Sequence, residues 1–542
     1  MQKSASFLIA VFLFLTASSQ TAPHRPKIVV GIVVDQMRWD YLYRYYDRYA
    51  DNGGFKRLLN QGYSCENTLI PYTPTITACG HAGIFTGSVP AIHGIIGNGW
   101  WDNKNNVSIY CVQDDSVKTV GSTTTAGQMS PANMLTTTVT DELRLATNFK
   151  SKVIGIALKD RGSILPAGHS ANAAYWYDSK TGDWITSTYY MKDLPQWVKD
   201  FNAKKLVDKY YEEGWSTLYP INTYEQSTED DKPYENKPFG AGTNFPYNLK
   251  KFAGTKSYGY LPVTPHGNTF TLEMAKAALT AEQLGKDSVT DFLTVSLSSP
   301  DYIGHTFGPN SIEAEDGFLR LDKALGEFLN FLNEKVGEGQ YLVFLSADHG
   351  AAHVPAFLKE HHIPAGNMDI EGLYTNLNKA LKEKYGADEL VSEISNSQVY
   401  LNHTLITSSK LNKNEMMQWV IDYCLHFPGI SAAFESASIA TTTLNATVKE
   451  MLTNGYNASR SGDIQLMLQP QWLEGFEKGG TTHGMWNPYD AHIPLLWYGW
   501  NIKPGKLYRQ TYMSDIAATI AAMLHIQMPS GCVGHVIEEV TK

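Results

Sequence analysis

Residues 27–35 read KIVVGIVVD, and this stretch gives the clearest indication of the fold. The run is rich in Val and Ile and does not alternate with polar residues, which is typical of a strand that is covered on both faces. It ends at Asp35, so a carboxylate lies directly after a buried strand. Open α/β sheets bind ligands outside the carboxyl ends of their strands, and Asp35 is therefore a candidate site residue.

Four further runs repeat this pattern, and they are Lys152–Leu158 (KVIGIAL), Asp291–Leu297 (DFLTVSL), Tyr341–Leu345 (YLVFL) and Ile493–Tyr498 (IPLLWY). Helical patterns lie between and after them, at Thr269–Leu284, Ser311–Val336 and Ser514–Leu524. Strands that alternate with helices predict an α/β fold. We expect residues 26–542 to form a doubly wound, mostly parallel sheet flanked by helices, with all five runs as parallel strands.

Two regions interrupt this rhythm of strands and helices. Residues 175–260 are crowded with Tyr, Trp, Pro, Asn and Lys, and residues 353–480 mix helical and short strand-like segments. We interpret both as insertions that build a smaller cap over the site.

The amino terminus has the pattern of a secretory signal peptide. Lys3 is followed by the apolar run FLIAVFLFL and by small residues, which predicts a signal peptide at residues 1–19 and a secreted or periplasmic protein. The run is too short for a stable membrane anchor. The formal net charge is −10, and this mild acidity argues against a nucleic-acid binder. The five cysteines are scattered and odd in number, so no disulfide framework is expected.

Six residues of metal-binding type lie at four places along the chain, each at the end of a predicted strand or in a loop just beyond one. They are Asp35, Asp301, His305, Asp348, His349 and His483. By chemistry they form two three-residue sets of carboxylate and imidazole. Such sets suit zinc, with a position left open for water or substrate.

Taken singly, these residues have ordinary explanations. Asp301 and His305 are four residues apart, a spacing that is common for surface pairs on a helix. The pair Asp348–His349 is more telling, because two polar residues at the end of an apolar strand are costly to bury without a partner. The other histidines are expected to be structural, exposed or in contact with a ligand residue, and His353 is the alternative metal ligand.

The candidate nucleophile lies in residues 74–81, PTITACGH. Thr77 begins a run of small residues that can open a helix, and a helix N-terminus favours phosphate. A plain capping threonine is the ordinary explanation of Thr77, and Thr75 is the alternative nucleophile. We interpret Cys79 as a packing residue, because two zinc ions with hard ligands favour an oxygen nucleophile.

The order of these motifs resembles the alkaline phosphatase superfamily. The matching motifs are Val-Val-Asp35, Pro-Thr-x-Thr77, His-Gly-Ile-x-Gly-Asn98, Asp301-x-x-Gly-His305, Ala-Asp348-His349-Gly and Thr-Thr-His483-Gly. They span nearly the whole mature chain. The resemblance implies two zinc ions per chain, with Asp35, Asp348, His349 and the Thr77 oxygen at one and Asp301, His305 and His483 at the other.

One further motif, Lys159-Asp160-Arg161, is similar to the Lys-x-Arg of the phosphate-irrepressible (PafA-type) alkaline phosphatases. A solvated surface pair is its ordinary explanation. The resemblance implies that Lys159, Arg161, Asn98 and the Thr77 N–H hold the outer phosphate oxygens. Phosphodiesterases of the superfamily usually lack this pair, so it favours a monoesterase.

The activity that the resemblance implies is that of an alkaline phosphatase. It would hydrolyse small phosphate monoesters through a phosphothreonine at Thr77, tolerate many leaving groups and release inorganic phosphate. We expect it to act as a monomer. A phosphodiesterase or nucleotide pyrophosphatase on the same core is the alternative enzyme, and a metal-independent phosphate-binding protein is a more distant alternative.

Overall fold

A ten-stranded sheet forms the centre of the computed structural model, which describes residues 24–240, 242–475 and 479–541. The strand order is β20 (Gly505–Leu507), β2 (Tyr63–Cys65), β19 (Leu495–Gly499), β11 (Tyr341–Ser346), β1 (Ile28–Val34), β10 (Asp291–Leu297), β7 (Val153–Ala157), β8 (Ala173–Asp178), β9 (Asp183–Ser187) and β6 (Thr119–Val120). The central strands β11, β1, β10 and β7 are parallel. Every residue of β1 and β10 is buried, which confirms the interpretation of the apolar runs. The predicted signal peptide, residues 1–19, lies outside the described residues.

The prediction that Ile493–Tyr498 forms a parallel strand is wrong. Pro494 separates the two-residue strand β18 (His492–Ile493) from β19, and β19 runs antiparallel to β11. The physical reason is where the chain enters the sheet. The segment before β18 lies at the carboxyl edge, where Gly350 N–H donates to Asp490 O at 2.7 Å. A strand that starts at this edge must run back through the sheet, and an apolar run carries no signal of its direction.

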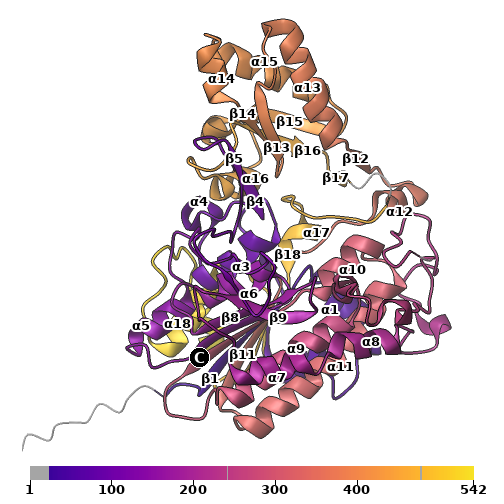
Figure 1. The fold of residues 1–542 in the computed structure, drawn as a ribbon, viewed down its shortest axis with the longest axis vertical. Helices are drawn as coiled ribbons and strands as arrows, with labels where there is room; N and C mark the ends of the chain where they lie inside the picture. Colours follow the sequence, from indigo (N-terminus) through magenta and orange to yellow (C-terminus); the bar gives the residue numbers. More distant parts are fainter. Residues whose placement is uncertain (1–23, 241, 476–478, 542) are drawn as a thin grey trace, which may run out of the picture.

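Helices cover both faces of the sheet (Figure 1). One layer contains α3 (Thr77–Thr86), α5 (Val139–Ala146), α6 (Asp160–Ala167) and α18 (Asp515–Leu524), and the other contains α2 (Gly54–Gln61), α9 (His266–Ala281) and α11 (Ile312–Lys335). Helix α11 begins after Ser311, whose hydroxyl accepts from the Ala314 N–H at 3.1 Å and caps the helix. This arrangement is the expected α/β fold.

Residues 366–474 form a second lobe with its own core, at the top of Figure 1. Its sheet has the order β13 (Val391–Ser395), β14 (Gln398–Leu401), β16 (Ile464–Leu468) and β15 (Ile430–Glu435), covered by α13 (Ile370–Tyr385), α14 (His403–Ser408) and α15 (Lys413–Leu425). In the other expected insertion, residues 175–260, most of β8 and all of β9 extend the central sheet, and α7 (Gln196–Ala203) and α8 (Leu206–Glu213) pack near α9. That these two segments act as a cap stays a prediction.

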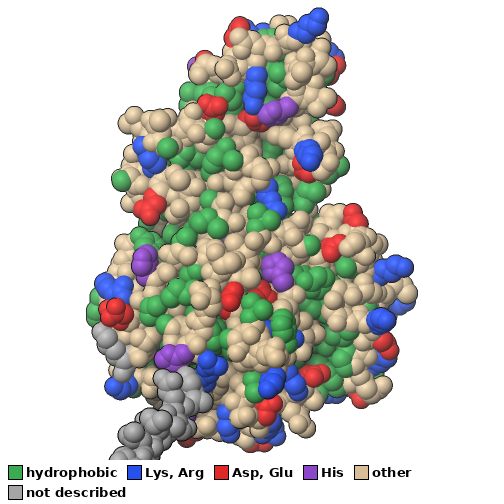
Figure 2. Space-filling model, turned by 90° about the vertical axis from the view of Figure 1, so that its left-hand side faces the viewer, with side chains coloured by type: hydrophobic (Ala, Val, Ile, Leu, Met, Phe, Trp, Pro, Cys, Tyr) green, Lys and Arg blue, Asp and Glu red, His purple; other side chains and the backbone are tan. Residues whose placement is uncertain are grey.

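Charged side chains of both signs are interspersed on the face shown in Figure 2. Among the described residues, no helix is long and apolar enough to cross a membrane. All five cysteines are free, and four of them are buried.

Candidate metal and phosphate site

The carboxyl ends of three neighbouring strands bring the predicted ligands together. Asp35 follows β1, Asp301 lies in the first turn of α10 (Ser299–Phe307) after β10, and Asp348 and His349 follow β11. The Asp35 N–H donates to Leu297 O at 3.1 Å, so the first and second strands stay in register up to the site. These side chains are almost fully buried.

The structure contains, in its described residues, two groups of possible metal ligands, and within each group the ligand atoms lie within 4.8 Å of one another. One group is Asp35, Asp348 and His349, and the other is Asp301, His349 and His483. His305 belongs to the same place, because its Nε2 lies 3.1 Å from Asp301 Oδ1. All six candidates therefore converge. His349 lies within reach of both groups, whereas the resemblance assigns it to the first ion.

The three histidines present the same nitrogen to the site. In each ring Nδ1 lies within hydrogen-bonding distance of a backbone carbonyl. The acceptors are Thr481 O for His305 (2.8 Å), Gly350 O for His349 (2.9 Å) and Thr75 O for His483 (2.7 Å). A donated Nδ1–H leaves the Nε2 lone pair free for a metal, which is how metal-binding histidines are normally oriented.

Contacts with Lys159 and His81 satisfy the buried carboxylates only in part. Within the described part of the chain, three carboxylate oxygens have no hydrogen bond: both oxygens of Asp35 and Oδ2 of Asp348. Burial, together with the neighbouring Asp348, raises the pKa of Asp35 well above its ordinary value. Burial opposes ionisation of Asp301 too, but His305 and Lys159 hold its pKa well below the usual range. Carboxylates that the chain satisfies only in part, placed beside oriented imidazoles, fit divalent cations, and the mixture of O and N donors suits zinc.

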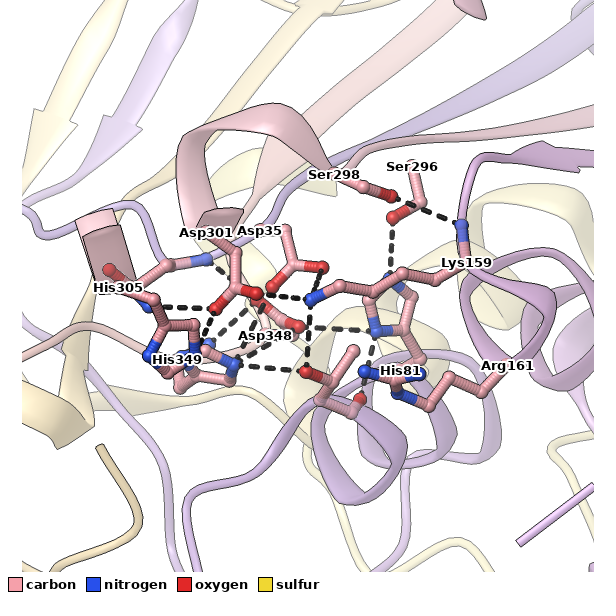
Figure 3. Close-up of polar contacts among 12 residues, drawn as sticks. Asp35, His81, Lys159, Arg161, Ser296, Ser298, Asp301, His305, Asp348 and His349 are labelled. Atoms are coloured by element: carbon pink, nitrogen blue, oxygen red, sulfur yellow. Dashed lines mark hydrogen bonds and ion pairs between the residues drawn. The ribbon is translucent and has the colours of Figure 1, made fainter. Parts of the chain in front are cut away.

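Lys159 lies at the centre of this cluster (Figure 3). Its Nζ is 2.8 Å from Asp35 Oδ2, forms an ion pair with Asp301 and lies 3.5 Å from Thr77 Oγ1. Two carboxylates and burial of the stem hold the ammonium in place, and Asp301 and Asp35 raise the pKa of Lys159 against the effect of burial. A surface ion pair does not explain this residue.

Arg161 lies in the first turn of α6, two residues after Lys159, and Tyr110 holds its side chain. Its guanidinium donates to the Tyr110 hydroxyl at 3.0 Å, and that hydroxyl donates to Asp160 Oδ1 at 2.5 Å. The Nε of Arg161 is buried without a hydrogen bond to any described residue. The guanidinium is thus positioned with donor capacity to spare, as recognition of an anion requires.

Thr77 is the first residue of α3, and it does not cap the helix. The capping position belongs to Ile76, and no side chain caps this end. The Thr77 hydroxyl lies 3.3 Å from His349 Nε2, inside the cluster. The Thr75 hydroxyl instead donates to Met485 O at 2.8 Å, which commits it to holding the loop that carries His483.

Two further residues complete the surroundings of Thr77. Asn98 Oδ1 accepts from the Ala78 N–H at 3.0 Å, which fixes its amide beside the start of α3. Cys79 is buried, its Sγ lies 3.2 Å from Ile95 O, and burial raises the pKa of its thiol well above the ordinary value. A thiol that resists ionisation is a poor nucleophile, so the geometry agrees with a packing role.

Gln36 is a site residue that the motif analysis missed. Its Nε2 donates to Asp301 Oδ1 at 2.7 Å and its N–H donates to Asp348 Oδ1 at 3.1 Å, so one residue connects carboxylates of both ligand sets. Its φ is +64°. A Cβ on Gly304 would lie 1.9 Å from the Gln36 side chain, which explains a glycine in the D-x-x-G-H motif. The sequence feature that could have indicated this role is the polar side chain of Gln36 directly after Asp35.

Other histidines near the site have different roles. His81 Nδ1 lies 2.9 Å from Thr77 O and 3.3 Å from Asp348, and its Nε2 lies 2.8 Å from the Ser296 hydroxyl. His81 therefore supports the nucleophile segment. His353 contacts Arg38 and Asn310, and among the described residues it joins neither ligand group.

A cavity of about 280 Å³ opens beside the cluster. Asn98, His305 and His483 line it from the main body, and residues of the second lobe line the opposite side. Access to the site thus runs between the two parts of the molecule.

A model of the type I phosphodiesterase / nucleotide pyrophosphatase family matches residues 29–490. The chain is 54% identical to "Alkaline phosphatase PhoV" of Synechococcus elongatus, over 96% of this chain and 93% of that one. It is also 54% identical to a Myroides odoratus protein called "Calcium-transporting ATPase", over 97% of both chains. "Alkaline phosphatase PafA" of Elizabethkingia meningoseptica is 50% identical over 98% of both. A crystal structure of wild-type PafA matches this fold with a TM-score of 0.94, at 49% identity, over 96% of this chain and 100% of that one.

Proposed function

We propose that this chain, which belongs to the type I phosphodiesterase / nucleotide pyrophosphatase family, is an alkaline phosphatase that hydrolyses phosphate monoesters with two zinc ions. The observation that carries this proposal is the position of Lys159, whose ammonium lies 3.5 Å from the Thr77 hydroxyl and amid the ligand carboxylates. A monoester dianion has one more anionic oxygen than a diester. A buried cation at that place stabilises the monoester reaction selectively.

Asp35, Asp348 and His349 would hold one zinc ion, and Asp301, His305 and His483 the other. When bound, the two ions would lower the pKa of a coordinated hydroxyl and neutralise charge on the entering and leaving oxygens. This role fits the orphaned carboxylate oxygens and the oriented imidazoles.

The chain's own residues account for the remaining steps. The Thr77 hydroxyl gives up its proton to solvent as its oxygen attacks phosphorus, the bond to the leaving oxygen breaks, and the alcohol departs with a proton from solvent, which leaves a phosphothreonine. Water then forms a new bond to phosphorus as the bond to Thr77 breaks, and inorganic phosphate is released. Lys159, Arg161 and the Asn98 amide hold the outer oxygens throughout, so positioning and electrostatics supply most of the rate.

The family name leaves room for a diesterase on the same core. Two alkaline phosphatases among the relatives and the Lys159–Arg161 pair favour the monoesterase. The test is hydrolysis of an aryl phosphate monoester against an aryl methyl phosphodiester, combined with metal analysis of the purified protein. Faster diester turnover would support the alternative, and phosphate binding without turnover would indicate a binding protein.

Location outside the cytoplasm is part of the proposal. The sequence of residues 1–19 supports it, and the amino-terminal sequence of the exported protein tests it.

A further inference from the structure

The cavity beside the site is lined by the tip of a hairpin from the second lobe. Strands β13 and β14 are joined by Asn396 and Ser397, and both residues have positive φ, 53° and 56°. Two-residue hairpins favour this conformation because its twist matches that of the strands. Asn396 Nδ2 donates to Gly99 O at 2.8 Å, which docks the tip onto the segment that follows Asn98.

The hairpin tip is tied to an acidic side chain at the base of the lobe. The Ser397 hydroxyl donates to Glu474, which ends β17 (Trp472–Glu474), and Gln465 Nε2 donates to Ser397 O at 3.0 Å. Glu474 lines the cavity and has no lysine, arginine or histidine within ion-pair distance in the described ranges. Burial raises the pKa of Glu474, and the hydrogen bonds from Ser397 oppose that effect.

Among the described residues that line the rest of the cavity wall, none is a lysine or an arginine. Apolar groups are supplied by Ile76, Leu473 and Met485, and neutral polar groups by Asn396 and Thr482. The cavity adjoins His305 and His483, the imidazoles of the ligand set that would face the leaving oxygen under the proposed function. Under that function, a group attached to the leaving oxygen would extend into this space.

We infer that this cavity is a leaving-group subsite, and that Glu474 selects alcohols that are neutral or cationic over alcohols that carry an additional negative charge. The inference rests on the proposed function. Above its pKa the Glu474 carboxylate, which lines the same cavity as His305 and His483, repels an anionic leaving group and attracts an ammonium there. The second lobe thereby contributes to substrate choice without contributing to the phosphate site.

The inference is tested with three small alkyl monoesters at pH 9, whose alcohols are ethanolamine, ethylene glycol and glycolate. For the wild type we expect kcat/KM to be lowest for the glycolate ester. Equal or higher kcat/KM for the glycolate ester would overturn the inference even without a variant. Failure to hydrolyse any of the three esters, or an aryl phosphate, would instead contradict the proposed function.

The variant Glu474→Gln assigns the selectivity to one side chain. It retains the size of the side chain and an acceptor for Ser397, so the hairpin tip stays docked. We expect the ratio of kcat/KM for the ethanolamine ester to that for the glycolate ester to fall about tenfold. The ratio is compared between wild type and variant for the same two esters, so the difference in their intrinsic reactivity cancels.

The matched control is Glu383→Gln, an exposed position on α13 of the same lobe. It changes the net charge by the same amount and is expected to leave the ratio unchanged. If both variants shift the ratio equally, the overall field of an acidic protein causes the selectivity and the assignment to Glu474 is wrong.

Discussion

The imidazole rings of His349 and His483 stack at 13°, with their centroids 3.5 Å apart. One ring comes from the end of β11 and the other from a loop near the carboxyl terminus of the chain. Burial lowers the pKa of both imidazoles, and the neighbouring His349 lowers that of His483 further. Neutral imidazole is the form that binds metals. The two ligand sets are therefore in direct contact through these rings, and a substitution in one set is expected to change metal binding at the other.

Replacing Thr77 tests the nucleophile. Thr77→Ala removes the only hydroxyl of the segment that lies inside the cluster, so we expect turnover to fall by about a thousandfold or more, with zinc content and phosphate binding retained. Thr77→Ser should remain active because it restores the hydroxyl. The control is Thr75→Val, which should lose only the hydrogen bond to Met485 and about 1 kcal/mol of stability. An inactive Thr75 variant beside an active Thr77→Ala would reverse the assignment.

Metal removal tests the two ligand sets. Chelation should abolish activity, and zinc should restore it. Asp301→Asn and His483→Ala should each lower zinc content, measured by elemental analysis, because each removes a donor from a buried group. His353→Ala is the histidine control and should leave zinc content unchanged, since its ring contacts Arg38 and Asn310. Full activity in the presence of a chelator would exclude the two-zinc site.

Gln36 is expected to position both ligand sets. Gln36→Ala removes the hydrogen bond to Asp301 and should weaken zinc affinity about 10- to 100-fold, measured by competition with a chelator of known affinity. Gln283→Ala is a matched control, because Gln283 also has a positive φ, 53°, but is exposed. Equal zinc affinity in the two variants would show that Gln36 has no positioning role.

The pair Lys159 and Arg161 is expected to select monoesters. Replacing both by Ala should lower monoester kcat/KM by about 100-fold for each lost contact and diester kcat/KM far less. The measurement is the ratio of the two kcat/KM values in the wild type and the double variant. The control replaces Lys152 and Arg144 by Ala. These residues lie near the other end of β7, donate hydrogen bonds to Glu282 O and Ser151 O, and should leave the ratio unchanged when replaced. An unchanged ratio in the Lys159 and Arg161 variant would favour the diesterase.

The sheet was predictable from the sequence because burial on both faces leaves a local mark. The runs at β1, β7, β10 and β11 are short, apolar and unalternating, and the structure places a strand at each. The direction of β19 was not predictable, because side-chain pattern is the same whichever way a strand runs. The resemblance to a family is likewise visible in the sequence, since it rests on the order of motifs along the chain.

Which residues could bind metals, and that they follow strands, could be read from the linear sequence, because donor chemistry and strand ends are both local properties. Three contacts became visible only in the folded protein: Gln36 links the two ligand sets, the Thr75 hydroxyl donates to Met485 O, and Glu474 reaches the cavity. Each of these facts depends on a contact between segments far apart in the chain. Such contacts depend on the packing of the whole sheet and of the second lobe upon it, and no window of neighbouring residues contains that information.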